Sequence, residues 1–468
     1  MREWPSESVD LCYLDPPFNS DANYNILFGK GLPVSESVAQ MTAFEDTWKW
    51  DDVAQERVDR ILLAIGNPSH FFIDGMHKII GECGMLAYLS YMAERVTEIW
   101  RVLKNHGSLY FHCDATASHY LKVMLDNILN KCEFRREIIW ANEDNSGFKA
   151  NASNWVRGHD TILYYVKNRG GGRATFHKLY TPYSKEYIDK MMKHVDENGR
   201  RYRLRGRKRY YEDENGVRIP SVWTGIKSFQ TITQSEEYLK YPTQKRLPIL
   251  ERIINASSNP GDIVLDPFCG CGTTVEAAKN LNRQFLGIDI SHFAIDVVRE
   301  RRLKDSSIPV HGFPRDLRSA EMMVQENPLE FEKWAITRIH GMIPNQRQVG
   351  DGGIDGRGRI YMDKGLVLSQ VKGKRSIPLG DVRDFCHVMN RENAKCGIFI
   401  SLRTVTSLGA KTEMKSLGSF EMGISNYPRG QLWSIEEYFN DRMPSLPALA
   451  DPITGDEMMY EDVFNTAK

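Results

Sequence analysis

A glycine-punctuated turn, Asp266-Pro267-Phe268-Cys269-Gly270-Cys271-Gly272-Thr273-Thr274, carries residue types that can grip a nucleotide-like ligand. Glycines let the backbone approach a ligand where a Cβ would block it, and the N–H groups of a following helical turn point at whatever is bound. Asp289 follows the glycines at about the twenty-residue spacing of a carboxylate that accepts hydrogen bonds from ribose hydroxyls. An ordinary strand-to-helix turn explains this spacing equally well. The candidate ligand-binding residues of this stretch are Asp266, Phe268, Gly270, Gly272, Thr273 and Asp289.

A second motif, Asp15-Pro16-Pro17-Phe18, directly follows the apolar segment 9–14. It combines a carboxylate, two prolines that stiffen the turn and an aromatic side chain. Open α/β sheets bind ligands beyond the carboxyl ends of their strands. We therefore predict a functional site at Asp15.

Strands and helices must alternate to bring these two motifs to one edge of a sheet. Apolar runs predict strands over 9–14, 107–114, 137–140, 160–165, 263–265 and 284–288. Apolar residues at helical spacing predict helices over 85–103, 117–129 and 247–257, with another beginning at 275. This alternation is typical of an α/β sheet with helices on both faces.

The two motifs together resemble the catalytic and cofactor motifs of DNA amino-methyltransferases, and their order is that of the beta class. The resemblance covers residues 1–302. It implies a Rossmann-like methyltransferase sheet that uses S-adenosyl-L-methionine. Beta-class members commonly carry a further strand and a Gly-Asp pair upstream, whereas fourteen residues precede Asp15 here, so completeness of the N-terminus is left open.

The resemblance implies that Asp15, Pro16, Pro17 and Phe18 are catalytic. An exocyclic amino group is a poor nucleophile because its lone pair is delocalised into the ring. Asp15 and the carbonyl of Pro16 would accept the two amino hydrogens, and Phe18 would stack on the flipped base. Family members with Asp at this position mostly modify the 6-amino group of adenine. We expect adenine, and the 4-amino group of cytosine is the alternative.

Further positions follow from the resemblance alone. The family has a motif like Tyr241-Pro242-Thr243-Gln244-Lys245 before the cofactor strand, where Thr243 and Lys245 would line the methionine end of the cofactor. His112 and Asp114 would lie near the target pocket without being catalytic.

Between residues 167 and 235 the alternation of strands and helices breaks, and arginines interleave with tyrosines over 200–211. Guanidinium groups pair with phosphates and with guanine, and tyrosines offer stacking surfaces. We predict a target-recognition insert that binds double-stranded DNA, and a solvated charged face is the alternative. Its candidate DNA-binding residues are Arg200, Arg203, Arg205, Arg207 and Lys208.

A second domain is predicted over 328–442, after a linker at 303–327 and before a frayed tail at 443–468. Asp355 precedes a predicted strand over 365–373 that carries Gln370 and Lys372 on one face, because side chains alternate with period two. This arrangement resembles Mrr-like nucleases of the PD-(D/E)xK superfamily and implies an α/β restriction-endonuclease-like fold.

In that resemblance Asp355 would hold a divalent metal such as Mg²⁺, and Gln370 would replace the usual acidic ligand. Lys372 would orient the attacking water, and Glu332 would be an auxiliary ligand. The alternatives are an incidental strand lysine and a domain that only binds DNA.

Composition adds few constraints. The 468 residues suggest two or three domains, and Lys plus Arg equals Asp plus Glu at 61 each, so a nucleic-acid surface must come from local clustering. The eight cysteines show no zinc-like pair of pairs and no apolar run is long enough for a membrane span. We expect reduced thiols in a cytoplasmic, nucleoid-associated prokaryotic protein, and the class makes a homodimer an option.

The leading hypothesis is a bifunctional protein: a DNA amino-methyltransferase with a fused nuclease-like domain, as in a single-chain restriction-modification enzyme. A solitary methyltransferase whose C-terminal domain only binds DNA is the first alternative. The second is a DNA-binding or scaffolding protein with an inactive methyltransferase fold.

Overall fold

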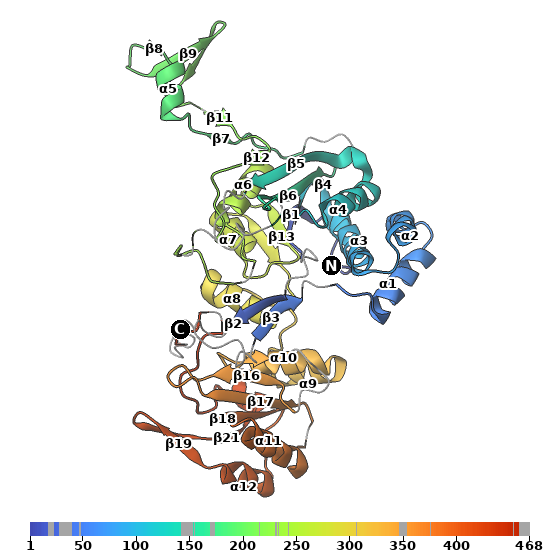
Figure 1. The fold of residues 1–468 in the computed structure, drawn as a ribbon, viewed down its shortest axis with the longest axis vertical. Helices are drawn as coiled ribbons and strands as arrows, with labels where there is room; N and C mark the ends of the chain where they lie inside the picture. The colour runs from blue at the N-terminus through green and yellow to red at the C-terminus, as the bar shows by residue number, and fades with distance from the viewer. Residues whose placement is uncertain are drawn as a thin grey trace. The chain divides into compact units, whose positions relative to one another are not determined.

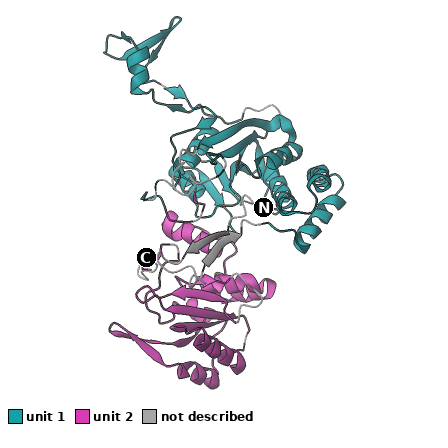
Figure 2. Ribbon diagram, viewed as in Figure 1, with its two compact units in different colours: residues 1–22, 46–238, 245–289 teal, residues 23–45, 239–244, 290–468 magenta. Residues whose placement is uncertain are grey.

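The chain folds into two compact units (Figure 2). The first comprises residues 1–22, 46–238 and 245–289, and the second comprises 23–45, 239–244 and 290–468. The computed structural model describes residues 1–16, 48–141, 153, 155–168, 174–214, 216–229, 232, 234–241, 243–305, 307–345, 353–374, 376–452 and 454–457, and the backbone of 23–27 and 40–45. Within these residues no helix is long and apolar enough to cross a bilayer.

A seven-stranded sheet with the order β12-β5-β6-β4-β1-β13-β14 forms the centre of the first unit (Figure 1). Its strands are β1 (Val9–Leu14), β4 (Leu103–Cys113), β5 (Phe134–Ala141), β6 (His159–Val166), β12 (Val222–Trp223), β13 (Ile263–Asp266) and β14 (Gln284–Gly287). Only β6 runs against its neighbours. The carboxyl ends of the other six strands therefore meet at one edge, together with the start of β6.

Helices cover both faces of this sheet, as the sequence predicts. The helices are α1 (Asp52–Leu63), α2 (Pro68–Ile80), α3 (Gly84–Val102), α4 (Ser118–Leu125), α6 (Leu247–Ser257) and α7 (Thr273–Asn280). Successive side chains of β1 point to opposite faces. Cys12 and Leu14 belong to the core formed with α1 to α4, whereas Leu11 and Tyr13 belong to the core formed with α6 and α7. All six residues of β1 are buried, so Asp15 follows a strand fixed from both sides.

The predicted insert contains short elements of its own. These are β7 (Tyr180–Thr181), α5 (Lys185–Met191), β8 (His194–Val195), β9 (Arg201–Arg205), β10 (Lys208–Tyr211) and β11 (Val217–Arg218). β8, β9 and β10 form an antiparallel sheet, and β11 pairs with β7. The chain thus enters and leaves this part through one two-stranded ladder.

A five-stranded sheet with the order β15-β16-β17-β18-β21 organises the second unit. Its strands are β15 (Ile343–Pro344), β16 (Gly356–Arg359), β17 (Leu366–Lys372), β18 (Cys396–Ser401) and β21 (Gly430–Ser434). One face packs on α9 (Leu317–Glu326) and α10 (Pro328–Thr337), and the other packs on α11 (Leu379–Arg391) and α12 (Leu408–Ser416). The second unit also contains α13 (Ile435–Tyr438) and the hairpins β19 (Ser419–Met422) with β20 (Ser425–Pro428) and β2 (Asn23–Leu27) with β3 (Gln40–Glu45).

The second unit extends beyond the predicted range 328–442 in both directions. Ala320 of α9, within the predicted linker 303–327, is fully buried in the same core as Trp334. Leu449, within the predicted tail, is also fully buried and forms a bridge with Ile360. The tail was expected to fray because it is rich in proline and acid, but its apolar residues complete a core.

The helix that follows Asp289 in the sequence also belongs to the second unit. This is α8 (His292–Val297), which continues into a π-helical turn, η4 (Val298–Arg302). Asp296 of α8 forms an ion pair of 2.5 Å with Arg338, and both side chains are nearly buried. Burial raises the pKa of Asp296 to about 6. The pair ties α8 to the helical layer of the C-terminal sheet.

Candidate functional site

Asp15 lies just beyond the carboxyl end of β1, where the topology predicts a site. Its Oδ2 accepts a hydrogen bond of 2.6 Å from Nζ of Lys245, and the side chains are 14% and 12% exposed. Its Oδ1 is buried and has no hydrogen-bond partner in the described part of the chain. A buried acceptor without a partner is costly, so its presence needs an explanation such as a ligand that binds there. One oxygen of this carboxylate is thus fixed by a cation, and the other is poised to accept a hydrogen.

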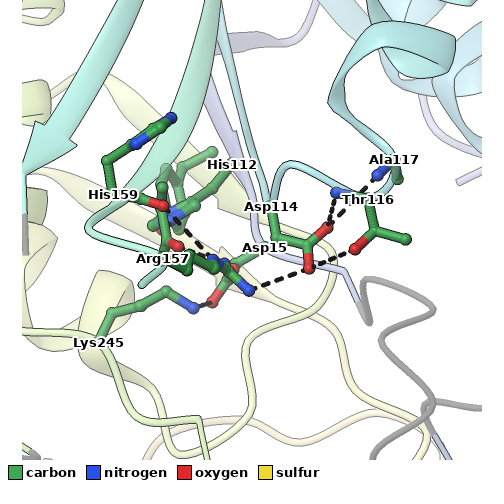
Figure 3. A network of polar contacts seen from close by, with 10 residues as sticks. Asp15, His112, Asp114, Thr116, Ala117, Arg157, His159 and Lys245 are labelled. Carbon is green, nitrogen blue, oxygen red and sulfur yellow. Dashed lines mark hydrogen bonds and ion pairs between the residues drawn. The ribbon is translucent and has the colours of Figure 1, made fainter. Parts of the chain in front are cut away.

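A polar network surrounds Asp15 at the same sheet edge (Figure 3). His112, at the end of β4, is fully buried; its Nδ1 lies 2.8 Å from the hydroxyl of Tyr13, and its Nε2 lies 3.2 Å from Asp160. Arg157 donates to both Asp114 and Asp160. Burial opposes ionisation of Asp160, but the hydrogen bond from His112 and the charges of Lys245 and Arg157 hold its pKa well below its usual range.

Asp114 fixes the turn after β4. Its Oδ1 accepts hydrogen bonds from the backbone N–H groups of Thr116, at 3.0 Å, and Ala117, at 3.4 Å. His112 and Asp114, which the sequence places near the target pocket, therefore position other residues of the network: His112 contacts Asp160, and Asp114 holds Arg157. Arg157 was not singled out from the sequence, since an arginine 43 positions from Asp114 carries no local signal.

The glycine turn begins where β13 ends and closes at the start of α7. Gly270 and Gly272 have φ angles of 47° and 80°, in the left-handed region that favours glycine. Asp289 Oδ2 accepts a hydrogen bond of 2.9 Å from the backbone N–H of Gly270, so the predicted ribose-binding carboxylate is joined to the turn. A Cβ on Gly287 would lie 3.1 Å from Sγ of Cys269, which shows how closely β14 packs on the turn.

Asp266 connects the two motifs electrostatically. Burial raises its pKa to about 7; hydrogen bonds from Thr274 and the N–H of Phe268 oppose the rise, and the charges of Asp15 and Asp289 add to it. Thr273 Oγ1 donates to the carbonyl oxygen of Lys245 at 3.2 Å and so links the start of α7 to the partner of Asp15.

The other predicted catalytic and cofactor residues do not all lie in this network. Phe268 is partly buried and packs against the core of the first unit. Thr243 has a φ of 61° and falls in the second unit. Pro16 is buried beside Asp15, whereas Pro17 and Phe18 lie outside the described residues.

The predicted DNA-binding residues divide into two groups. Arg200 is held by Asp196 and Asp213, and its guanidinium lies 4.1 Å from the ring of Tyr211, so it stabilises the insert. Arg203 lies near the rings of Tyr187 and Tyr210. The exposed side chains are those of Arg205, Arg207 and Lys208, and the register places Arg205 opposite Lys208 at the β9–β10 turn.

The predicted nuclease residues gather around β16 and β17. Gly356 pairs with Ser369 in the antiparallel register, so Asp355 and Gln370 are opposite each other, and Lys372 follows two residues along the same face. Asp355 Oδ2 accepts a hydrogen bond of 2.7 Å from the N–H of Val371. Gln370 Oε1 is buried and lacks a hydrogen-bond partner among the described residues. Glu332 lies on α10.

The described residues contain no group of three or more His, Cys, Asp or Glu side chains arranged to hold a metal ion. The carboxylate of Asp355 and the amide oxygen of Gln370 are nevertheless oxygen ligands of the kind that Mg²⁺ prefers.

Comparison with known proteins gives two family matches. Residues 9–300 match the DNA methylase family, and residues 324–421 match a restriction endonuclease family. The chain is similar to the DNA adenine methyltransferase YhdJ of Escherichia coli, with 28% identity over 293 residues, covering 62% of this chain and 75% of that protein. It is 33% identical over 218 residues to the Type II methyltransferase M.HpaI of Haemophilus parainfluenzae, covering 46% of this chain and 59% of that relative. The crystal structure of the M1.HpyAVI–SAM complex aligns with a TM-score of 0.30 and 23% identity, covering 45% of this chain and 82% of that one.

Proposed function

Because the chain belongs to the DNA methylase family through residues 9–300, we propose that it transfers the methyl group of S-adenosyl-L-methionine to the 6-amino group of adenine in double-stranded DNA. The observation that carries this proposal is the state of Asp15, whose Oδ2 is fixed by Lys245 while its buried Oδ1 has no partner within the described residues. The relative named a DNA adenine methyltransferase supports adenine as the target. The 4-amino group of cytosine is the alternative, because the same acceptor geometry serves either base.

The described residues account for activation of the amino group. Oδ1 of Asp15 accepts a hydrogen bond from one N–H of the target amino group, and the carbonyl of Pro16 accepts a hydrogen bond from the other. The two bonds draw the nitrogen towards tetrahedral geometry, with its lone pair directed at the methyl group to be transferred. Lys245 holds the carboxylate in orientation during this step. S-adenosyl-L-methionine supplies a sulfonium methyl group as the electrophile, and no covalent enzyme intermediate is needed.

The glycine turn fits this cofactor. Gly270 and Gly272 leave the backbone open to a ligand, and Asp289 sits at hydrogen-bond distance from the turn, where ribose hydroxyls can be bound. The carboxyl of Asp266, with a pKa of about 7, adds a group that a nearby positive charge stabilises in its ionised form. These residues would bind and orient the cofactor beside Asp15.

For the C-terminal domain we propose a Mg²⁺-dependent nuclease activity, supported by the register that sets Asp355 opposite Gln370. Asp355 would hold the ion together with Oε1 of Gln370, which is buried and has no hydrogen-bond partner among the described residues. Glu332 would add a further oxygen, and Lys372 would orient the attacking water. Together with the methyltransferase, this would make a single-chain restriction-modification enzyme.

Transfer of radiolabelled methyl from S-adenosyl-L-methionine to unmethylated genomic DNA, followed by nucleoside analysis, tests the first proposal. We expect label in 6-methyladenine with the intact protein and none with Asp15→Ala. Label in 4-methylcytosine would keep the mechanism and overturn the base. Absence of label with the intact protein would refute the methyltransferase proposal.

Magnesium-dependent cleavage of the same DNA tests the second proposal. We expect cleavage by the intact protein, loss of cleavage in Asp355→Ala, and unchanged methylation in that variant. Cleavage that persists in Asp355→Ala would show that the metal site is assigned to the wrong residues.

A further inference from the structure

A cavity of about 660 Å³ opens on the face of the first sheet that packs on α6. Cross-strand neighbours form its floor, since Tyr110 of β4 pairs in register with Tyr164 of β6, and Tyr164 pairs with Arg136 of β5. The two tyrosine rings stack with centroids 4.4 Å apart and planes inclined by 11°. The hydroxyl of Tyr110 is bound to Oγ of Ser257 at 2.6 Å, which anchors the floor to α6.

The lining of this cavity is largely apolar, and its charged residues are all arginines. Four arginines, Arg135, Arg136, Arg218 and Arg252, contribute to it, and no aspartate or glutamate does. Arg135 is engaged by the carbonyl of Cys132, and Arg252 lies 5.0 Å from the ring of Trp223. Arg136 and Arg218 are exposed, and their guanidinium groups have no hydrogen-bond or ion-pair partner among the residues that the structure describes. Two guanidinium groups are therefore available at the mouth of an aromatic cavity.

The walls add a further flat surface. Phe176 lines the cavity and is 47% exposed, although a large apolar side chain gains free energy by burial. Its ring lies 6.2 Å from that of Tyr164, with the planes inclined by 29°. Exposed aromatic faces bind nucleobases by stacking, and arginine forks bind phosphate through two parallel hydrogen bonds.

We propose that this cavity binds a nucleoside monophosphate unit, with its base against the exposed ring of Phe176 and its phosphate held by Arg136 and Arg218. The unit can be a free nucleotide or part of a DNA strand, because both present the same base and phosphate. The arginines select an anion, and the exposed ring of Phe176 selects a planar ring over a simple phosphate.

This cavity is distinct from the site at Asp15. Its lining contains neither Asp15, nor Lys245, nor any residue of the glycine turn. The two sites meet along one cross-strand row, in which Ile162 lies between Ile138 of the cavity and His112 of the network at Asp15. The proposal therefore holds whether or not the chain methylates DNA.

Fluorescence of 2-aminopurine deoxyribonucleoside monophosphate tests the proposal, since stacking quenches this base. We expect saturable quenching by the full-length protein, about tenfold weaker affinity for each of Arg136→Ala and Arg218→Ala, and a comparable loss when the probe lacks its phosphate. Ala174→Phe, which fills the cavity from its wall, should abolish quenching. Arg315→Ala, which removes an exposed arginine elsewhere in the chain, is the matched control and should bind as the native protein does.

Asp15→Ala distinguishes the two sites, and the proposal requires that it bind the probe with native affinity. Loss of binding in Asp15→Ala, or native affinity in the Arg136→Ala/Arg218→Ala double variant, would overturn the proposal. Single-stranded oligonucleotides that displace the probe would identify a DNA strand as the source. A probe that they fail to displace would identify the free nucleotide.

Discussion

Replacing Asp15 by Asn should abolish most of the turnover while leaving the fold nearly unchanged. The substitution keeps the shape of the side chain but gives it one acceptor and one amide NH₂. Lys245 donates to Oδ2 at 2.6 Å, so the amide oxygen must take that place and the NH₂ must take the place of Oδ1. A donor then faces the amino group that needs an acceptor.

The expected losses in kcat and in folding free energy follow from the number of groups that the substitution affects. Loss of one preorganised group aimed at the reacting atom lowers kcat by about 10²–10³, or roughly 3–4 kcal/mol of transition-state stabilisation. The cost in folding free energy should be about 1 kcal/mol, since only one charge-assisted contact is weakened and Oδ1 has no described partner to lose.

Asp10, at the other end of the same strand, provides a matched control. Lys104 donates to both of its oxygens at 2.8 Å, and the N–H of Ile263 donates to Oδ2 at 3.0 Å, so both oxygens are hydrogen-bonded. Asp10→Asn should therefore cost about 2–3 kcal/mol of folding free energy, because it removes the charge of a buried carboxylate that holds three hydrogen bonds, while kcat of the folded protein is retained.

Single-turnover methyl transfer and urea unfolding of both variants measure the two quantities. We expect Asp15→Asn to lower kcat more than Asp10→Asn does, and Asp10→Asn to lower the free energy of unfolding more than Asp15→Asn does. A kcat for Asp15→Asn within about threefold of native, or equal catalytic losses in the two variants, would refute the role assigned to the Oδ1 acceptor.

Three further predictions follow from other described contacts. The pKa of Asp266 is about 7 in the folded protein, whereas an unfolded Asp ionises near pH 4. Because the unfolded chain releases this proton first as the pH rises, the free energy of unfolding should fall by about 2 kcal/mol from pH 5 to pH 7. Urea unfolding of Asp266→Asn should lack this decline. Asp289→Ala should weaken binding of S-adenosyl-L-methionine about tenfold or more in calorimetry, and unchanged affinity would remove Asp289 from the cofactor site. Arg205→Ala should weaken DNA binding and reduce the slope of log affinity against log salt by about 1, whereas Arg201→Ala, which breaks an ion pair with Asp189, should leave that slope unchanged.

Periodicity predicted the positions of most elements in the first unit because each is buried on a defined face. The predicted helix 247–257 and strand 9–14 coincide with α6 and β1. Helices α1 and α2 were not anticipated, since the segment around them carries no motif. The burial of Leu449 was also missed, because a short apolar stretch between prolines gives no local sign of its bridge with Ile360, which is far away in the chain.

The site was partly predictable for a similar reason. Asp15, Asp266 and Asp289 stand at ends of apolar runs, and parallel strands bring such ends to one edge. The pairing of Asp15 with Lys245 spans 230 positions, so its geometry depends on the path of the chain between β12 and α6 rather than on local pattern. The aromatic cavity depends likewise on register between β4, β6 and β5, which one-residue slips would destroy.

The sheet edge at Asp15 accumulates features that reduce stability. Asp266 is buried, and the charges of Asp15 and Asp289 raise its pKa further. Oδ1 of Asp15 is buried without a partner in the described residues. Each of these features costs free energy in the protein alone. A nearby cation would attract the ionised carboxyl of Asp266, and a hydrogen-bond donor would pair with Oδ1 of Asp15, so both costs would be offset by a bound ligand. A sulfonium cofactor and an amino group supply those two properties, which is why the unfavourable electrostatics of this edge support methyl transfer to an amine over a role confined to binding DNA.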